Sequence, residues 1–314
     1  MESIPGFQKA LADGSLQELR AFPKADLHRH SILGTGLRNI EKWAGISLPK
    51  PPARMESLDE MRTYLHDILY PHILNRDGFE FTAESAIDDA VHDGVAILEM
   101  SLDVRFIEMY ADGLRGFLDF VGRLVARSPG RIQFRPEIGI SKDRDPRTQI
   151  PPASECIGSG LFRSIDIYGN ELAQPPEAYS GLYSEAGKRG LKLKAHVGEF
   201  ASAAHVLRTA QVLHLDEVQH GISAATSRET MQFLRTHGIR LNVCPSSNVA
   251  LSRVARISAH PIRRLVDDGV RVSINSDDPT IFGRSVSEEY LALYAAAVLS
   301  AAELDGIRED SLRS

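Results

Sequence analysis

Two histidines near the amino terminus, His28 and His30, are separated by a single residue. Side chains two positions apart on a β-strand point to the same face, so both imidazoles can reach one ligand. Arg29 points to the opposite face, and we expect its stem beneath a helix and its guanidinium in solvent. The pair alone indicates a metal site only weakly, because two histidines hydrogen-bonded in a polar rim have the same spacing.

The elements that must position these histidines alternate along the chain. Apolar segments between breaks predict eight strands, and helical patterns lie between most of them, several ended by a glycine. The predicted strands are 25–30, 95–102, 132–140, 162–168, 192–197, 217–220, 239–244 and 270–275. This alternation favours an α/β fold, a (β/α)8 TIM-type barrel with extra helices after the first strand. We expect residues 1–314 to form a single barrel domain.

An open, doubly wound sheet is the competing architecture. A glycine fingerprint after the first strand would favour it, but residues 34–36 (GTG) lack the third glycine and an acidic partner about 20 residues later. Helices are predicted at 7–20, 58–74, 82–92, 110–127, 176–189, 201–213, 227–236 and 261–268. The proline-rich connection 142–161 argues against a full crossover helix there.

Polar residues gather where the predicted strands end, the edge at which barrels of this type place their active sites. Three imidazoles and one carboxylate suit zinc, which lowers the pKa of a bound water towards neutrality. The predicted ligands of one zinc ion per chain are His28, His30, His196 and Asp277.

The other polar residues of this edge are acid and base candidates: Glu199, His220 and Asp278. Each also has a purely structural interpretation. His220 could be a hydrogen-bonded histidine before a glycine turn, and Glu199 a carboxylate stabilised by a helix amino terminus. Asp278 could be a turn or N-cap residue. One catalytic site explains why all of them occur at the same edge, so we favour it.

Several motifs resemble the adenosine deaminase family of the amidohydrolase superfamily. They are 23–30 (PKADLHRH), 196–199 (HVGE), 219–221 (QHG), 242–249 (NVCPSSNV), 260–261 (HP) and 273–279 (SINSDDP). The resemblance extends over about residues 22–290, with the motifs in the family's order. It implies a metal-dependent aminohydrolase with a mononuclear zinc site made by the four residues named above.

The resemblance also implies individual roles. Glu199 would protonate the purine ring nitrogen beside the amino-bearing carbon, and His220 would orient and help deprotonate the attacking water. Asp278 would contact the imidazole side of the purine, and Gly169 would offer its backbone amide to the base. The expected substrate is a 6-aminopurine: adenosine, adenine, or a 5′- or N6-modified adenosine derivative, with release of ammonia.

The sequence departs from the family pattern at Ile32, in the substrate-binding region beside His30. Adenosine-specific members usually have aspartate there, which holds the ribose 5′-hydroxyl. Isoleucine cannot accept a hydrogen bond, so we expect an altered or apolar 5′ end. A further hypothesis is that Arg29 or Arg38 binds a phosphate group of the substrate. There are two alternatives: an enzyme that hydrolyses another C–N or ester bond, and a catalytically silent relative that binds nucleosides. The presence of Glu199 favours deamination.

Composition excludes several other classes. With 43% hydrophobic and 25% charged residues and a net charge of −6, the chain is typical of a soluble globular protein without an electrostatic preference for nucleic acid. The polynucleotide deaminase signature is absent, since Cys244 lies on the wrong side of Pro245. The sequence has only two cysteines, and it shows neither a signal-peptide pattern nor a run of 18 apolar residues. We therefore expect a cytoplasmic protein that binds no membrane.

Overall fold

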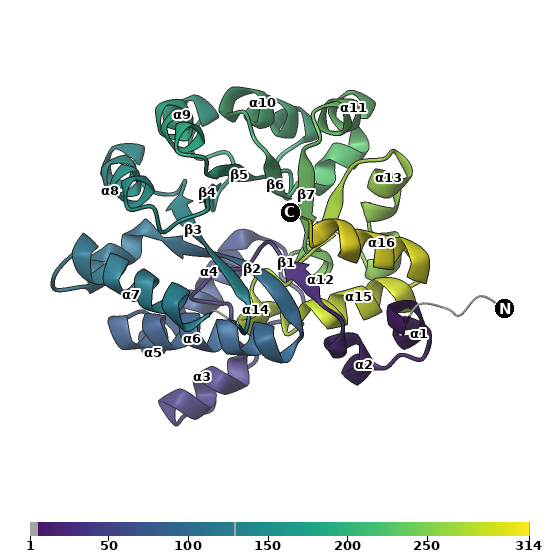
Figure 1. Cartoon of the computed structure of the whole chain (residues 1–314), viewed down its shortest axis with the longest axis horizontal. Coiled ribbons are helices and arrows are strands. Elements are labelled where there is room, and N and C mark those ends of the chain that lie inside the picture. Colours follow the sequence, from purple (N-terminus) through teal and green to yellow (C-terminus); the bar gives the residue numbers. More distant parts are fainter. Residues whose placement is uncertain (1–5, 129, 314) are drawn as a thin grey trace.

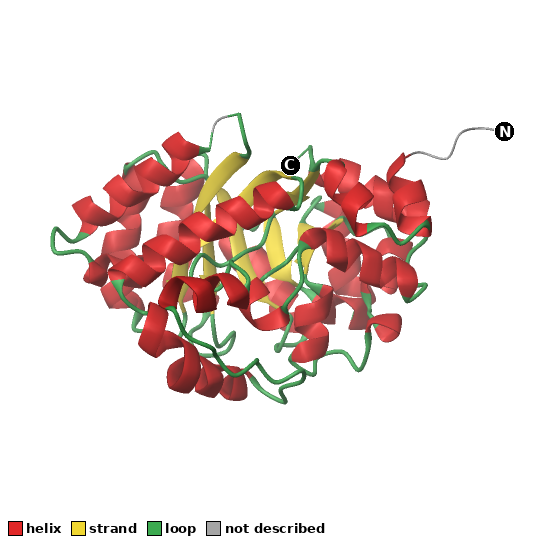
Figure 2. Ribbon diagram, turned by 90° about the horizontal axis from the view of Figure 1, so that it is seen from below, coloured by secondary structure: helices red, strands yellow, loops and turns green. Residues whose placement is uncertain are grey.

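Eight parallel strands form the centre of the molecule and follow one another around the sheet in chain order. The structure is a computed structural model that describes residues 6–128 and 130–313, and the strand count refers to these residues. Helices surround the strands (Figures 1 and 2). The strands are β1 (Lys24–Asp26), β2 (Val95–Asp103), β3 (Gln133–Ser141), β4 (Ser164–Tyr168), β5 (Lys192–Val197), β6 (Glu217–His220), β7 (Arg240–Val243) and β8 (Val272–Ile274).

The ring closes between the segments that follow β1 and β8. The Asp277 N–H donates to the His28 carbonyl at 3.0 Å, and the His30 N–H donates to the Asp277 carbonyl at 3.3 Å. The Leu27 N–H donates to the Asn275 side chain at 2.8 Å. These contacts make the sheet a nearly closed (β/α)8 barrel, as the alternation predicted, and not an open doubly wound sheet.

Helices connect successive strands, and extra ones follow β1 as expected. They are α1 (Gly6–Ala12), α2 (Leu16–Ala21), α3 (Leu37–Ala44), α4 (Leu58–Tyr64), α5 (Tyr70–Ile73), α6 (Arg76–His92), α7 (Leu114–Arg127), α8 (Pro146–Gly158), α9 (Ser180–Lys188), α10 (Ala203–Leu213), α11 (Arg228–Thr236), α12 (Pro245–Ala250), α13 (Ile262–Asp267), α14 (Pro279–Phe282), α15 (Val286–Ala295) and α16 (Ala301–Ser311). A π-helix, Leu65–Leu69, joins α4 to α5. Short 3₁₀ helices are Val104–Met109, Pro176–Tyr179, Ile222–Thr226 and Ile257–Ala259.

Three helix predictions were wrong, and the one for 58–74 failed because the π-helix separates α4 from α5. The helix expected at 7–20 is two helices, because Gly14 adopts a positive φ of 65° and Ser15 caps α2. The connection 142–161, where no full helix was expected, contains α8 with two prolines inside it. The Gln149 side chain holds this helix to β3 by bonding both the N–H of Ser141 (3.1 Å) and its carbonyl (2.6 Å).

The expectation for Arg29 was also wrong. Its side chain is buried, and Nε lies 3.0 Å from Asp26 Oδ2 and 2.9 Å from Ser276 Oγ. One terminal nitrogen donates to the carbonyl of Ala86 at 2.9 Å. Asp26 lies three residues before Arg29 and compensates its charge, which allows the guanidinium to stay inside.

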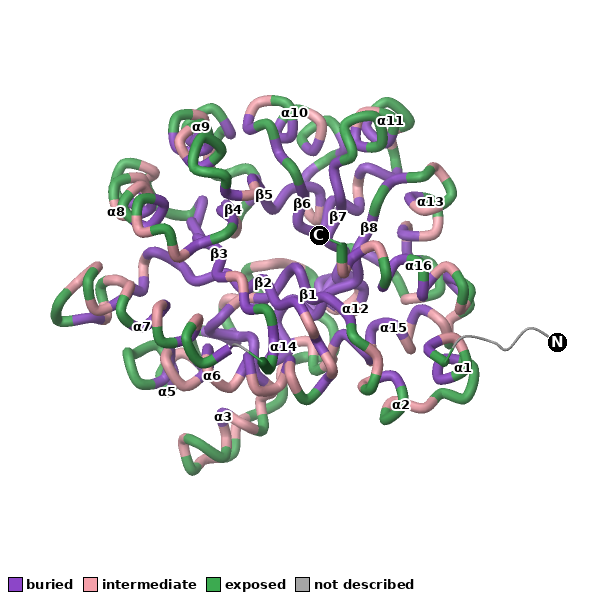
Figure 3. The backbone as a smooth tube through the Cα atoms, viewed as in Figure 1, coloured by how far each residue is buried: buried purple, intermediate pink, exposed green. Residues whose placement is uncertain are grey.

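Burial is concentrated in the strands and the inward faces of the helices (Figure 3). The barrel interior also holds a charged cluster around Lys194 in β5, whose Nζ lies 2.9 Å from Glu137 and 3.6 Å from Glu217. His196 lies two residues further along β5 and points to the same face, above this cluster. Within the described part of the chain, no helix is long and apolar enough to cross a membrane.

Candidate active site

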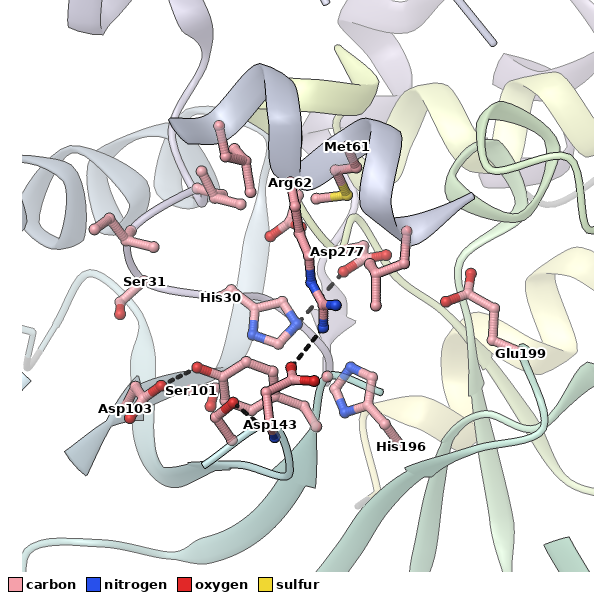
Figure 4. Close-up of a pocket in the computed structure, with 18 of the residues that line it drawn as sticks. His30, Ser31, Met61, Arg62, Ser101, Asp103, Asp143, His196, Glu199 and Asp277 are labelled. Atoms are coloured by element: carbon pink, nitrogen blue, oxygen red, sulfur yellow. Dashed lines mark hydrogen bonds and ion pairs between the residues drawn. The ribbon is translucent and has the colours of Figure 1, made fainter. Parts of the chain in front are cut away.

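A cavity of about 310 Å³ opens where the strands end. Part of its wall is apolar, and α4 and the π-helix contribute Leu58, Met61 and Leu65 to that part. The polar part includes most of the residues singled out from the sequence. Those that line the cavity are His30, Ile32, Gly169, His196, Glu199, His220, Asp277 and Asp278. Figure 4 shows His30, His196 and Asp277 turned towards one another, with Glu199 further along the wall.

Three of the four predicted metal ligands line this cavity, and the fourth, His28, is buried next to them. Ring nitrogens of His28, His30 and His196 lie within 4.8 Å of one another. Asp277 Oδ1 is 3.3 Å from Nε2 of His28 and 3.6 Å from Nε2 of His30. The fold therefore brings together side chains that the sequence predicted to meet, from residues as far apart as 28 and 277.

The local backbone explains how these side chains converge. The sequence predicted His28 and His30 on the first strand, but β1 ends at Asp26, so both histidines follow the strand. Single bridges then hold Arg29 to Asp277 and His30 to Ser101. Asp277 and His220 have positive φ angles of 62° and 61°, which are uncommon away from glycine and cluster at functional sites.

These residues fit a divalent cation chemically. Burial lowers the pKa of His30 to about 3 and that of His196 to about 4, so both rings are neutral. Burial opposes ionisation of Asp277, but the surrounding imidazoles outweigh it and hold its pKa below the usual range. Nε2 of His28 is buried without a hydrogen-bond partner among the described residues. Neutral nitrogens around an ionised carboxylate are the donor set that zinc prefers.

His196 is oriented by a carboxyl group behind it. Its Nδ1 lies 2.8 Å from Oδ2 of Asp166, the middle residue of β4. This leaves Nε2 to face the cavity, as in other metal sites where a carboxylate fixes a histidine ligand.

Glu199 and His220 form the second part of the site. Burial raises the pKa of Glu199 to about 7, although His220 opposes the shift, so the carboxyl can carry a proton at neutral pH. Its Oε1 lies 3.5 Å from His220 Nδ1. α10 begins at Ala203 with Ser202 as its N-cap, so Glu199 is not part of the first helical turn. The helix-terminus interpretation therefore does not explain its position.

Asp278, Gly169 and Ile32 surround the remaining space. Asp278 is the N-cap residue of α14, but its side chain makes no capping hydrogen bond, and Oδ1 is buried without a partner among the described residues. Gly169 has φ of 94°, and the Asp143 carboxylate occupies the place of a β-carbon. Ile32 is 4% exposed and lines the wall.

The sequence reasoning missed several polar residues of the cavity. Arg62 reaches from α4 to Asp143 (Figure 4), and Arg105 Nε lies 3.1 Å from Asp103 Oδ2. Arg144 also lines the cavity, whereas Arg29 and Arg38 do not. No motif marked these arginines, because each follows a strand or lies on a helix whose orientation only the fold determines.

Comparisons with known proteins identify the family of this chain. The family model for adenosine deaminase matches residues 158–314. A protein of Treponema pallidum described as a putative adenosine/adenine deaminase is 36% identical over 286 residues, which cover 91% of this chain and 96% of that protein. The chain belongs to the adenosine deaminase family. It is therefore a hydrolytic deaminase that acts on adenine-type substrates, and the resemblance seen in its motifs is confirmed.

Solved structures of an adenine deaminase and of an amidohydrolase share the fold of this chain. The adenine deaminase from Arthrobacter aurescens is 23% identical, covers 93% of each chain and superposes with a TM-score of 0.77. An amidohydrolase from Burkholderia ambifaria, solved with bound Zn, is 19% identical, covers 100% of this chain and 97% of its own, and gives a TM-score of 0.69.

Proposed function

We propose that this protein is a zinc-dependent enzyme that replaces the amino group of a 6-aminopurine by oxygen and releases ammonia. The convergence of three imidazoles and Asp277 beside the protonatable Glu199 carries the proposal. The description of the Treponema pallidum relative supports an adenine-type base, and the zinc in the Burkholderia ambifaria structure supports the choice of metal.

Zinc would be held by His28, His30, His196 and Asp277, and it would supply Lewis acidity at that point of the cavity. His220 lies on the Asp277 side, with Nε2 3.8 Å from Asp277 Oδ2, and orients the attacking water there. Glu199 donates its proton to the ring nitrogen beside the amino-bearing carbon. The water oxygen forms a bond to that carbon, and the bond between the carbon and the amino group breaks. One water proton goes to the amino group, which leaves as ammonia. The other water proton returns to Glu199 and replaces the one that it donated.

The purine would lie between Glu199 and Asp278. Asp278 faces its imidazole side, and the Gly169 backbone amide faces the edge of the base. Ile32 lies near the part of the wall that meets the N9 substituent, so an apolar or altered 5′ end is favoured over an unmodified ribose.

A substrate panel tests the function. Zinc-loaded protein should release ammonia from at least one of adenine, adenosine, 5′-deoxyadenosine, 5′-thioadenosines and N6-substituted purines. Among the nucleosides, the 5′-modified ones should be preferred. If metal analysis confirmed one zinc per chain and none of these aminopurines released ammonia, the proposal would be rejected.

We also propose that the chain works as a single barrel domain in the cytoplasm. Cys156 and Cys244 are both free and buried. Free thiols are the rule in the reducing cytoplasm.

A further inference from the structure

Two motifs noted in the sequence, 242–249 and 260–261, have no role in the proposed chemistry so far. Each contributes a buried polar side chain: Asn248 contacts the acid Glu199, and His260 contacts Asn248. Asn248 in α12 is 0% exposed, and His260, which precedes α13, is 3% exposed. They form a continuous chain of hydrogen bonds that leads from the backbone of α13 to Glu199 and His220.

The chain starts by fixing which nitrogen of His260 carries the proton. The backbone N–H of Ile262 donates to His260 Nδ1 at 3.1 Å. A backbone N–H can only donate, so Nδ1 must present its lone pair. Burial also lowers the pKa of His260 to about 3, which keeps the ring neutral. The single ring proton is therefore on Nε2.

This proton then fixes the amide of Asn248. His260 Nε2 lies 3.2 Å from Asn248 Oδ1, so it donates to that oxygen. The amide nitrogen must then lie on the opposite side, where Nδ2 is 2.7 Å from Glu199 Oε1 and 3.3 Å from His220 Nδ1. Its two N–H groups can serve both acceptors.

The amide orientation determines where Glu199 can hold its proton. Oε1 accepts from Asn248, and the Ser247 hydroxyl lies 3.5 Å from the same oxygen. A flipped amide would instead turn Oδ1 towards Oε1 and draw the proton to that oxygen. We infer that Asn248 and His260 are positioning residues that hold the proton of Glu199 on Oε2, ready for transfer to the purine.

The same amide also acts on His220. The Asn248 amide nitrogen lies 3.3 Å from His220 Nδ1, while His220 Nε2 lies on the Asp277 side. This contact helps to hold the orientation of the His220 ring. This inference rests on the proposed deaminase function.

Paired substitutions at His260 separate positioning from simple packing. His260→Gln keeps an N–H that can donate to Asn248, whereas His260→Leu does not. We expect His260→Leu to lower kcat by about 10- to 100-fold with KM within about threefold, and His260→Gln to restore most of the loss. His237→Leu, at an exposed histidine, is the matched control and should leave kcat unchanged. Equal losses in both His260 variants, or none in either, would overturn the inference.

A second measurement does not depend on turnover. Long-range ¹H–¹⁵N correlation spectra of zinc-loaded protein should show His260 protonated on Nε2 and not on Nδ1 from about pH 5 to pH 9. The His260 signals are identified by their absence from the spectrum of His260→Gln. A proton on Nδ1, or titration of His260 within this range, would overturn the inference. If the wild type released no ammonia from any aminopurine, the proposed function would fail, and the spectra would still decide the proton positions.

Discussion

Glu199 illustrates how burial can suit a carboxyl to the proposed role of proton donor. Desolvation is the largest influence on its pKa and raises it to about 7. The protonated form must be the active one, so kcat/KM should be constant below this pKa and fall about tenfold per pH unit well above it. A pH profile of kcat/KM with saturating zinc measures this. A flat profile between about pH 6 and pH 9 would contradict the assignment of Glu199 as the acid.

The side chain of residue 32 is proposed to determine which 5′ end of the substrate the cavity accepts. Replacing it by aspartate, Ile32→Asp, puts an acceptor into the apolar wall, and we expect kcat/KM for adenosine to rise about tenfold or more relative to 5′-deoxyadenosine. The Tm should fall, because a carboxylate in that wall loses hydration. Ile32→Val is the control and should keep the preference of the wild type. An unchanged ratio in Ile32→Asp would show that specificity is determined elsewhere.

At the residue scale, the sequence indicated which histidine and acidic side chains come together, because such residues at strand ends are few. It did not assign a role to Asn248 or His260. Their function depends on which atom faces which partner, and that follows from the position of α12 and α13 relative to β5 and β6. Arg29 was placed wrongly for a similar reason, since its partners Ser276 and Ala86 come from distant segments.

At the element scale, the loop after β5 is held by one carboxylate. Glu171 is buried and accepts the backbone N–H groups of residues 198–201 at 2.6 to 3.0 Å. This fixes the loop that carries Glu199. In Glu171→Gln one oxygen is replaced by an amide nitrogen, which faces these donors, so we expect a loss of about 2–4 kcal/mol in the free energy of unfolding and a lower kcat.

Urea unfolding and steady-state kinetics measure both effects. The control is Glu177→Gln, at an exposed glutamate paired with Arg208, where the free energy of unfolding should change by less than about 1 kcal/mol. If Glu171→Gln were as stable and active as Glu177→Gln, the loop would not depend on this carboxylate.

The strands were predicted more accurately than the helices. β5 and β6 have the predicted bounds, although their sequences, KLKAHV and EVQH, are not continuous apolar runs. The segment 58–74 was expected as one helix, but a π-helix interrupts it, and this depends on packing over the cavity. α8 formed despite Pro151 and Pro152, since its contacts with β3 override local propensity.

At the scale of the whole molecule, the proposed metal site joins the segments that follow the first and last strands. His28 and His30 follow β1 and Asp277 follows β8, so a bound ion ties together the two ends of the barrel. A ligand that binds only the folded state raises its stability. Removal of metal by a chelator should therefore lower the Tm, and added zinc should restore it. An identical Tm with and without zinc would exclude a metal held by these residues.

The closure of the barrel was predictable, because alternating strands and helices leave few other architectures. The convergence of polar residues at one edge followed from that closure. What the sequence could not supply is the set of contacts across the cavity, such as Arg62 with Asp143, which depend on how α4 lies over the strand ends.

The most direct test of this account is a zinc titration of metal-free protein, with ammonia release from its best aminopurine as the readout. We predict that activity is absent without metal, rises in proportion to added zinc and levels off at one zinc per chain. The same titration of His196→Ala should give little activity at any ratio. Full activity in metal-free protein, or activity in His196→Ala equal to the wild type, would contradict a zinc-dependent deaminase site built from His28, His30, His196 and Asp277.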